Sequence, residues 1–165
     1  MCTWNGASYL PEQLDSIARQ SRKPNELIIC DDLSNDNTRA ILQSFSTTAN
    51  FRVRIIENPT RLGSTANFSK AISLCEGDII ILSDQDDVWL IEKIAKIERH
   101  FETDSILGGI FTDAELIDQH GNKLHNNLWS TIGFGFAEKN ALRRGRGLDI
   151  LIQGNFVTGA TLAFR

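Results

Sequence analysis

The strongest constraint on the fold is a regular alternation of short apolar segments with segments of helical periodicity. Strands are predicted over residues 26–30, 51–56 and 78–82, the last of which (DIIIL) is the most apolar. Four helical stripes accompany them, at Leu10, Leu14, Ile17 and Ala18, at Ile41 and Phe45, at Phe68, Ala71, Ile72 and Cys75, and at Leu90, Ile94, Ile97 and Phe101. Short apolar strands joined by such helices pair in parallel. The sequence therefore predicts an α/β fold, with a Rossmann-like, mostly parallel sheet and helices on both faces.

The boundaries of these helices are predicted from individual residues. The first helix is expected to end before Lys23-Pro24, because proline cannot continue a helix. Gly77 is expected to close the third helix as its C-terminal glycine. Asp87 is expected to cap the fourth helix, which is predicted to begin near Leu90.

The alternation stops after Ile106. Residues 109–111 have the character of another strand and 116–124 that of a hairpin. The remainder is Gly-rich and irregular until an apolar run at 156–164. Because no repeat or linker divides the chain, residues 1–165 are expected to form a single domain, incomplete at its N- and C-termini.

Composition excludes several classes of protein. The chain has 165 residues, enough for one buried core, with 17 Lys and Arg against 21 Asp and Glu. The resulting net charge of −4 argues against sequence-unspecific binding of nucleic acid. Cys2, Cys30 and Cys75 are widely spaced and predicted to be buried free thiols. The longest aliphatic run, residues 79–82, is too short to cross a bilayer, and a cytoplasmic location is expected.

Two predicted strands end in carboxylates. Asp31-Asp32 follow the first of them, and the run SDQDD at residues 83–87 follows the most apolar one. Ligands of an open parallel sheet bind outside the carboxyl ends of its strands, and clustered carboxylates there suit a hard divalent cation such as Mg²⁺. For a single Asp pair, turn formation and helix capping are the simpler explanation. Two clusters at one edge favour a ligand site.

Other common motifs for phosphate binding or catalysis are absent. The chain has no GxxxxGK[ST], and Gly133-Phe134-Gly135 lacks both the third glycine and the preceding strand of a dinucleotide site. No GxSxG elbow is present, and His100, His120 and His125 are expected on the solvated surface. The acidic strand ends are therefore the main candidates for chemistry.

A series of sequence blocks, in a fixed order, points to a known family. It starts with TWNG at residues 3–6, Tyr9-Leu10 and QLDSI at 13–17, and continues with DDLSNDNT at 31–38. Asn58, Gly63, Asn67, GDII at 77–80, SDQDDVW at 83–89 and Gly159-Ala160-Thr161 complete it. Over essentially the whole chain, these blocks resemble family 2 glycosyltransferases, which have the GT-A fold. The SDQDDVW form is most similar to the rhamnosyltransferase-type members.

The resemblance implies roles for the donor-side residues. The Cys2 backbone, the Trp4 ring and the Asp32 carboxylate would hold the base of a nucleotide-sugar. Asp84-Gln85-Asp86 matches the DxD motif, with Asp84 near the ribose and metal. Asp86 would ligate Mg²⁺ or Mn²⁺ that bridges the diphosphate. Asn67 and Arg61 would line the donor pocket.

The resemblance also covers the acceptor side. Gly159 and Ala160 match a loop that approaches the acceptor sugar, and Asn155 could bind a sugar hydroxyl or serve only in a turn. The general base of the family lies beyond this loop, so it is expected past Arg165. Asp113 is expected near the same cleft, but it does not match the base motif of the family. No catalytic base is named.

The implied activity is inverting transfer of a sugar from a dTDP- or UDP-sugar to a saccharide or lipid-linked acceptor in surface polysaccharide synthesis. The basic cluster Arg143-Arg144-Gly145-Arg146 is either a solvated face or a site of peripheral attraction to a phosphorylated lipid or an anionic membrane. One alternative is a receiver-type phosphoacceptor module built on Asp31-Asp32 and Asp84, although the Thr/Ser and Lys of such modules find no match. A second alternative is a truncated fragment without activity.

Overall fold

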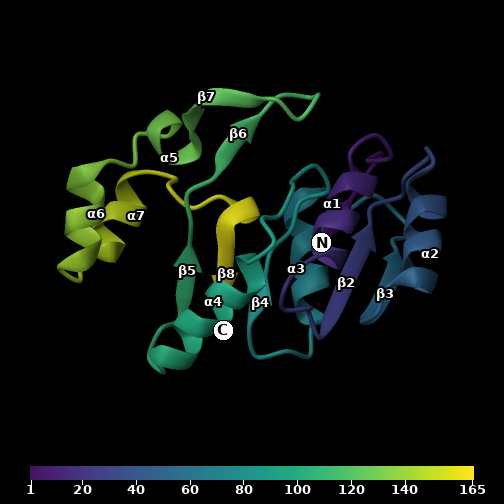
Figure 1. The fold of residues 1–165 in the computed structure, drawn as a ribbon, viewed down its shortest axis with the longest axis horizontal. Coiled ribbons are helices and arrows are strands. Elements are labelled where there is room, and N and C mark those ends of the chain that lie inside the picture. The colour runs from purple at the N-terminus through teal and green to yellow at the C-terminus, as the bar shows by residue number, and fades with distance from the viewer. The chain divides into compact units, whose positions relative to one another are not determined.

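The computed structural model describes all residues, 1–165, and they fall into two compact units (Figure 1). The first unit comprises residues 1–109 and 163–165, and the second comprises residues 110–162. They subdivide the domain predicted over residues 1–165, and its folding as one domain stays a prediction.

The first unit is built around a parallel three-stranded sheet. Its strands are β1 (Cys2–Thr3), β2 (Glu26–Asp31) and β3 (Arg52–Glu57), in the order β1-β2-β3. All six residues of β2 pair with β3, whereas β1 pairs only with Cys30 and Asp31 at the end of β2. The predicted parallel pairing is confirmed for the strands expected at 26–30 and 51–56.

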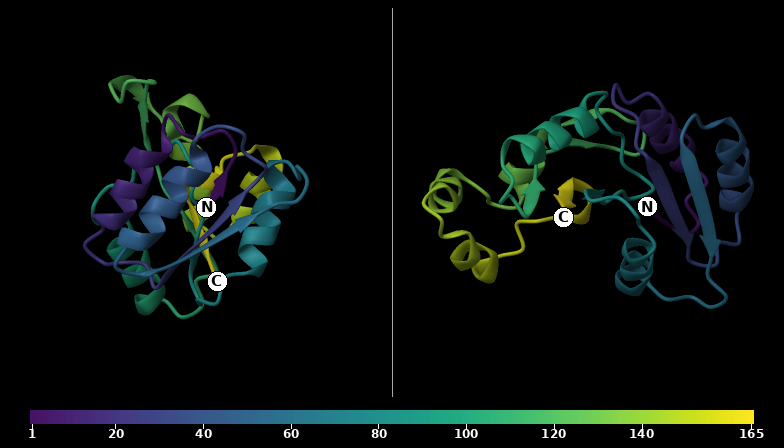
Figure 2. Two further views of the ribbon diagram at one scale, coloured as in Figure 1. Left: turned by 90° about the vertical axis from the view of Figure 1, so that its right-hand side faces the viewer. Right: turned by 90° about the horizontal axis from the view of Figure 1, so that it is seen from below.

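Helices cover both faces of this sheet because side chains alternate along β2. Leu27 and Ile29 pack with α1 (Leu10–Ala18) and α2 (Thr38–Thr48) in one hydrophobic cluster. Ile28 and Cys30 belong to a second cluster. That second cluster contains residues of α3 (Ser64–Ser73), namely Ala71 and Phe68. Figure 2 shows α1 and α2 on one side of the strands and α3 on the other.

A second sheet departs from the predicted boundaries. The strand predicted at 78–82 is reduced to β4 (Ile80–Ile81), which pairs antiparallel with β8 (Leu162–Phe164). The sheet order is β4-β8-β5, with β5 at Gly109–Phe111. β8 is also shorter than the apolar run of 156–164 suggested.

The helix boundaries also need correction. α4 (Lys93–Thr103) begins three residues after Leu90, which is 74% exposed and does not belong to the inner stripe. Its N-cap is Glu92, so Asp87 does not cap it. α3 ends at Ser73, before Gly77.

A tertiary contact explains the late start of α4. Gln20, fully buried two residues after α1, donates from Nε2 to the Leu90 carbonyl over 2.9 Å and accepts from the Ile94 amide at 3.1 Å. The Ser16 hydroxyl accepts from the Trp89 amide at 2.9 Å. These side chains hold the segment ahead of the helix and satisfy one of its free amides.

The second unit contains the predicted hairpin. It also contains three helices, in a segment for which the sequence predicts irregular structure. The hairpin is β6 (Glu115–Ile117) and β7 (Lys123–Asn127). The helices are α5 (Leu128–Thr131), α6 (Phe136–Arg143) and α7 (Gly147–Gln153). The aromatic rings of Phe111, Trp129 and Phe134 pack against one another, and the ring of Phe156 packs against Phe134. This cluster organises a segment whose sequence has little regular periodicity.

An apolar cavity of about 250 Å³ lies inside the first unit. Its wall includes Ile17, Ile28, Ile72, Ile80 and Ile94. None of the residues predicted to bind a nucleotide lines it, so this cavity is distinct from the predicted site. None of the helices has the length and apolar character that crossing a membrane requires.

Candidate nucleotide-sugar site

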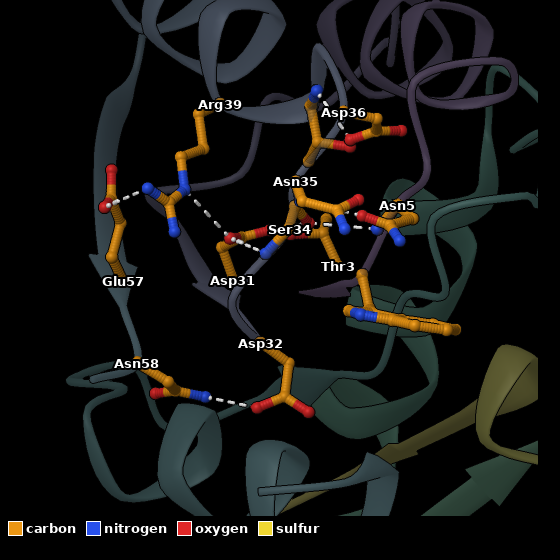
Figure 3. Close-up of polar contacts among 12 residues, drawn as sticks. Thr3, Asn5, Asp31, Asp32, Ser34, Asn35, Asp36, Arg39, Glu57 and Asn58 are labelled. Carbon is orange, nitrogen blue, oxygen red and sulfur yellow. Dashed lines mark hydrogen bonds and ion pairs between the residues drawn. The ribbon is translucent and has the colours of Figure 1, made fainter. Parts of the chain in front are cut away.

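The two carboxylates at the end of β2 have different surroundings (Figure 3). Asp31 is fully buried and accepts hydrogen bonds from the Thr3 hydroxyl at 2.8 Å and the Ser34 amide at 2.9 Å. Arg39 lies 3.5 Å from its Oδ2 and pairs with Glu57 at 3.2 Å. Asp31 therefore ties the strand end to the loop that follows and is not free to bind a ligand.

Asp32 is directed to the loop after β3. Its Oδ1 accepts from Asn58 Nδ2 at 2.9 Å and from the Leu62 amide at 2.7 Å, and its Oδ2 accepts from the Gly63 amide at 2.8 Å. Burial alone would raise the pKa of Asp32, but these hydrogen bonds, helped by the charge of Arg61, lower it. Asp32 is therefore ionised at neutral pH and holds this loop in place.

Asn67 is linked to Asp32 through Asn58. Its Oδ1 accepts from Asn58 Nδ2 at 2.8 Å, and its Nδ2 donates to the Cys30 carbonyl at 2.9 Å. Lys70 donates to Asn58 Oδ1 at 2.7 Å. The Asn67 amide is thus engaged within the protein, where it supports the partners of Asp32.

Trp4 presents an aromatic ring next to this loop. The ring residue is 42% exposed, and the Arg61 guanidinium carbon lies 3.4 Å from the ring centroid. The Nε of Arg61 is also 4.0 Å from Asp32 Oδ2. Asp32, Arg61 and Trp4 therefore form a continuous row at the carboxyl ends of β1 and β2.

The backbone turn after Trp4 is fixed by the loop that follows β2. Asn5 has a φ of 47°, in the left-handed region that asparagine tolerates. Its amide donates to the Ser34 hydroxyl at 2.9 Å, and its side-chain oxygen accepts from the Asn35 amide at 2.9 Å. Figure 3 shows Asn5 beside Asn35 and Ser34. These contacts fix the backbone next to Trp4, and with it the position from which the indole side chain extends.

Cys2 lies beneath this row. The carbonyls of Met1 and Thr3 accept hydrogen bonds from the Cys30 and Asp32 amides of the neighbouring segment. Because backbone groups alternate along a strand, the N–H and C=O of Cys2 face away from β2. Burial raises the pKa of its thiol to about 12, with further contributions from nearby acidic groups that include Asp32 and Asp84. Cys2 thus carries no thiolate at neutral pH.

The loop after β4 brings three carboxylates together. Burial, and then repulsion from Asp86, raises the pKa of Asp84. Burial, followed by the charge of Asp84, raises the pKa of Asp87 to about 6, and its Oδ2 is buried without a hydrogen-bond partner. Burial also lowers the pKa of Lys93 to about 8. Mutual repulsion of these carboxylates is the condition that a bound cation relieves.

The residues present fit a divalent ion that is shared with a ligand. No group of three or more His, Cys, Asp or Glu side chains is arranged to hold a metal ion by itself. Mg²⁺ typically takes one or two carboxylates together with substrate phosphates. Asp86 is exposed and Asp84 half-buried beside it, which is a donor set of that kind.

The residues predicted on the acceptor side all belong to the second unit. Asp113 accepts through Oδ1 from the amides of Ala114 and Trp129, both at 2.9 Å, and so supports the start of α5. Asn155 is exposed in the segment after α7. Gly159 and Ala160 lie in a 3₁₀ turn over Gly159–Thr161. Their roles stay predictions.

Comparison with known proteins assigns the family. Residues 1–158 match the profile described as Glycosyl transferase family 2. The chain belongs to this family. The dTDP-rhamnosyl transferase RfbG of Shigella flexneri is 37% identical over 98 residues, which is 57% of this chain and 34% of that protein. The chain thus spans about a third of the length of this relative. The family assignment sets aside the receiver-type alternative.

Solved structures confirm the GT-A fold that the resemblance predicted. The S. aureus TarS structure 1–349 in complex with UDP matches with a TM-score of 0.57 and 24% identity, over 62% of this chain and 30% of that one. The mannosyltransferase PcManGT from Pyrobaculum calidifontis, in complex with GDP-Man and Mn²⁺, matches with a TM-score of 0.61 and 22% identity, over 71% and 34%.

Proposed function

We propose that this chain is the nucleotide-sugar-binding part of an inverting, divalent-metal-dependent glycosyltransferase. Its donor would be a dTDP- or UDP-sugar, and its acceptor a saccharide or lipid-linked saccharide in surface polysaccharide synthesis. The observation that carries the proposal is the row of Asp32, Arg61 and Trp4, which the Gln85 side chain joins to the acidic loop through two hydrogen bonds to the Trp4 backbone. This arrangement offers a nucleobase a stacking surface and an acceptor, and offers a diphosphate a cation site.

The base would bind at Trp4 and Asp32. An exposed indole stacks on any nucleobase, which supplies affinity without much selectivity. An ionised carboxylate offers about four acceptor positions, of which the partners of Asp32 use three. The remaining position would accept the ring N–H that uracil and thymine both carry. Arg61 would stack beside the base or leave the ring on binding.

The diphosphate would bind at the acidic loop. Asp86, with Asp84, would hold the divalent ion, which when bound neutralises the charge that develops on the departing nucleoside diphosphate. The Mn²⁺ in the complex of the mannosyltransferase PcManGT and the name of the rhamnosyl transferase RfbG support this assignment.

Inversion requires a base that deprotonates the acceptor hydroxyl for in-line attack on the anomeric carbon. The Asp113 carboxylate already accepts the amides of Ala114 and Trp129, which is the role of a turn residue. We therefore assign no residue of this chain as the base. Arg143, Arg144 and Arg146 are exposed, and peripheral attraction to an anionic lipid surface stays part of the proposal.

The test is calorimetric titration of the chain with UDP and with dTDP, each with and without Mn²⁺. At least one nucleotide is expected to bind more tightly with Mn²⁺, by about tenfold or more, as a shared cation site requires. Asp86→Asn should abolish this enhancement, whereas Asp78→Asn, at an exposed position, should keep it. Nucleotide affinity that does not change with Mn²⁺, or a Mn²⁺ enhancement that persists in Asp86→Asn, would contradict the proposal.

A further inference from the structure

Gln85 makes two hydrogen bonds to the backbone of one residue. Its Oε1 accepts from the Trp4 amide at 2.8 Å, and its Nε2 donates to the Trp4 carbonyl at 3.2 Å. A reciprocal pair of this kind normally joins two backbone segments in a sheet. Here a side chain forms it, between residues 81 positions apart in the sequence.

Gly6 provides the space that this contact occupies. A Cβ placed on Gly6 would lie 2.2 Å from Gln85 Oε1 and 2.5 Å from its Cδ. The Gly6 amide donates to the Thr38 hydroxyl at 2.9 Å, which prevents the backbone from moving away. Gly6 is not among the glycines with a positive φ, so the glycine is needed for space and not for backbone conformation.

The acidic loop is anchored on its other side by a second glutamine. Gln13, fully buried in α1, donates from Nε2 to the Ser83 hydroxyl at 2.9 Å and to the Asp84 carbonyl at 3.3 Å. The loop is thus fixed to α1 just before Gln85 and to the Trp4 backbone at Gln85. Asp84 and Asp86 flank the residue that holds Trp4.

We propose that Gln85 is a positioning residue that sets the distance between the Trp4 ring and the Asp84–Asp86 carboxylates. This inference rests on the proposed function. A nucleoside diphosphate engages both features at once, and the two contacts reinforce each other only when their separation matches the ligand. Without Gln85, each contact can still form alone, but binding of the whole ligand loses the advantage of prior alignment.

The first experiment compares a fragment with the whole ligand. Gln85→Met keeps the length of the side chain and removes both hydrogen bonds. It should weaken binding of UDP with Mn²⁺ (or of dTDP, if that nucleotide binds the wild type better) by about tenfold, because the lost alignment must then be restored on binding. Binding of uridine or thymidine without metal should change less than about twofold, because neither nucleoside reaches the acidic loop. Gln43→Met, on the exposed surface of α2, should alter neither.

The second experiment tests the fit between Gly6 and Gln85. Gly6→Ala should weaken nucleotide binding about as much as Gln85→Met, because the added methyl displaces the carboxamide. In a Gln85→Ala background the same substitution should cost nothing further. Thermal unfolding of each variant shows whether it folds, and Gln85→Met provides the test if Gly6→Ala does not.

The outcomes separate the two proposals. If the wild type binds neither UDP nor dTDP in a Mn²⁺-dependent manner, the proposed function and this inference both fail. If the wild type binds and Gln85→Met leaves the affinity for the diphosphate unchanged, only the inference fails. Equal weakening for nucleoside and diphosphate, or additive effects of Gly6→Ala and Gln85→Ala, would likewise show that Gln85 has a general structural role.

Discussion

Asp31 and Asp32 are adjacent in the sequence, yet one binds Ser34 and Thr3 and the other binds the loop after β3. The sequence predicts both carboxylates at a strand end where ligands bind. It does not distinguish their roles, because the partners of each carboxylate come from other segments of the chain. The backbone amide of Asp32 still donates to the Thr3 carbonyl, so these two consecutive side chains point to opposite sides of an extended chain. Only the contacts formed after folding distinguish their roles.

Asp32 should make the stability of the protein depend on pH. Its folded-state pKa lies below the usual value of 3.8, so its stabilisation is complete above that pH and is lost as the pH falls through the folded-state pKa. Asp32→Asn should lower the free energy of unfolding at pH 7 by about 1–3 kcal/mol. The difference from the wild type should shrink below about pH 4.

Urea unfolding at pH 7, 5, 4 and 3 measures this effect. Asp78→Asn, which removes an exposed carboxylate, serves as the matched control and should track the wild type at each pH. A difference between Asp32→Asn and the wild type that stays constant down to pH 3 would show that the hydrogen bonds to Asp32 do not depend on its charge.

At the scale of elements, the sequence predicts the strands and helices around β2 correctly, because their burial follows simple periods. Leu27 and Ile29 alternate with Ile28 and Cys30, and the two pairs pack against helices on opposite faces of the sheet. The start of α4 escapes prediction, since it depends on Gln20 and Ser16, which are distant in sequence and have no periodic signature. Likewise, nothing in the DxD motif indicates that its central Gln85 binds the Trp4 backbone.

Gln20 should be important for the stability of α4. Its side chain is fully buried and joins the Leu90 carbonyl to the Ile94 amide, so Gln20→Leu would leave both groups without these partners. We expect the free energy of unfolding to fall by about 2–4 kcal/mol. Urea denaturation measures it, with Gln43→Leu on the exposed surface of α2 as the control. Equal stability of the two variants would show that water replaces these contacts at no cost.

At the scale of the molecule, the first unit consists of two separate stretches of the chain, residues 1–109 and 163–165, that flank the second unit. β8 supplies the partner of β4 from the far end of the sequence, with Ile80 opposite Phe164. The sequence predicts one domain but gives no sign of this division, because its signals are local and the division arises from long-range contacts.

This arrangement predicts cooperative unfolding. Since the sheet containing β4 is completed only by residues after the second unit, the chain should unfold in a single thermal transition by both far-ultraviolet circular dichroism and tryptophan fluorescence. Two separated transitions would show instead that the units are independent domains. Absence of any transition would support the alternative of an inactive, unfolded fragment.

The complete pairing of β2 with β3 has a consequence for how the protein fluctuates. All six residues of β2 pair with β3, and Asp32, directly after β2, accepts hydrogen bonds from the Leu62 and Gly63 amides in the loop after β3. The amides of this ladder should therefore be among the last to exchange their hydrogens with solvent. The part of the sheet that presents Asp32 would stay ordered while less buried segments open.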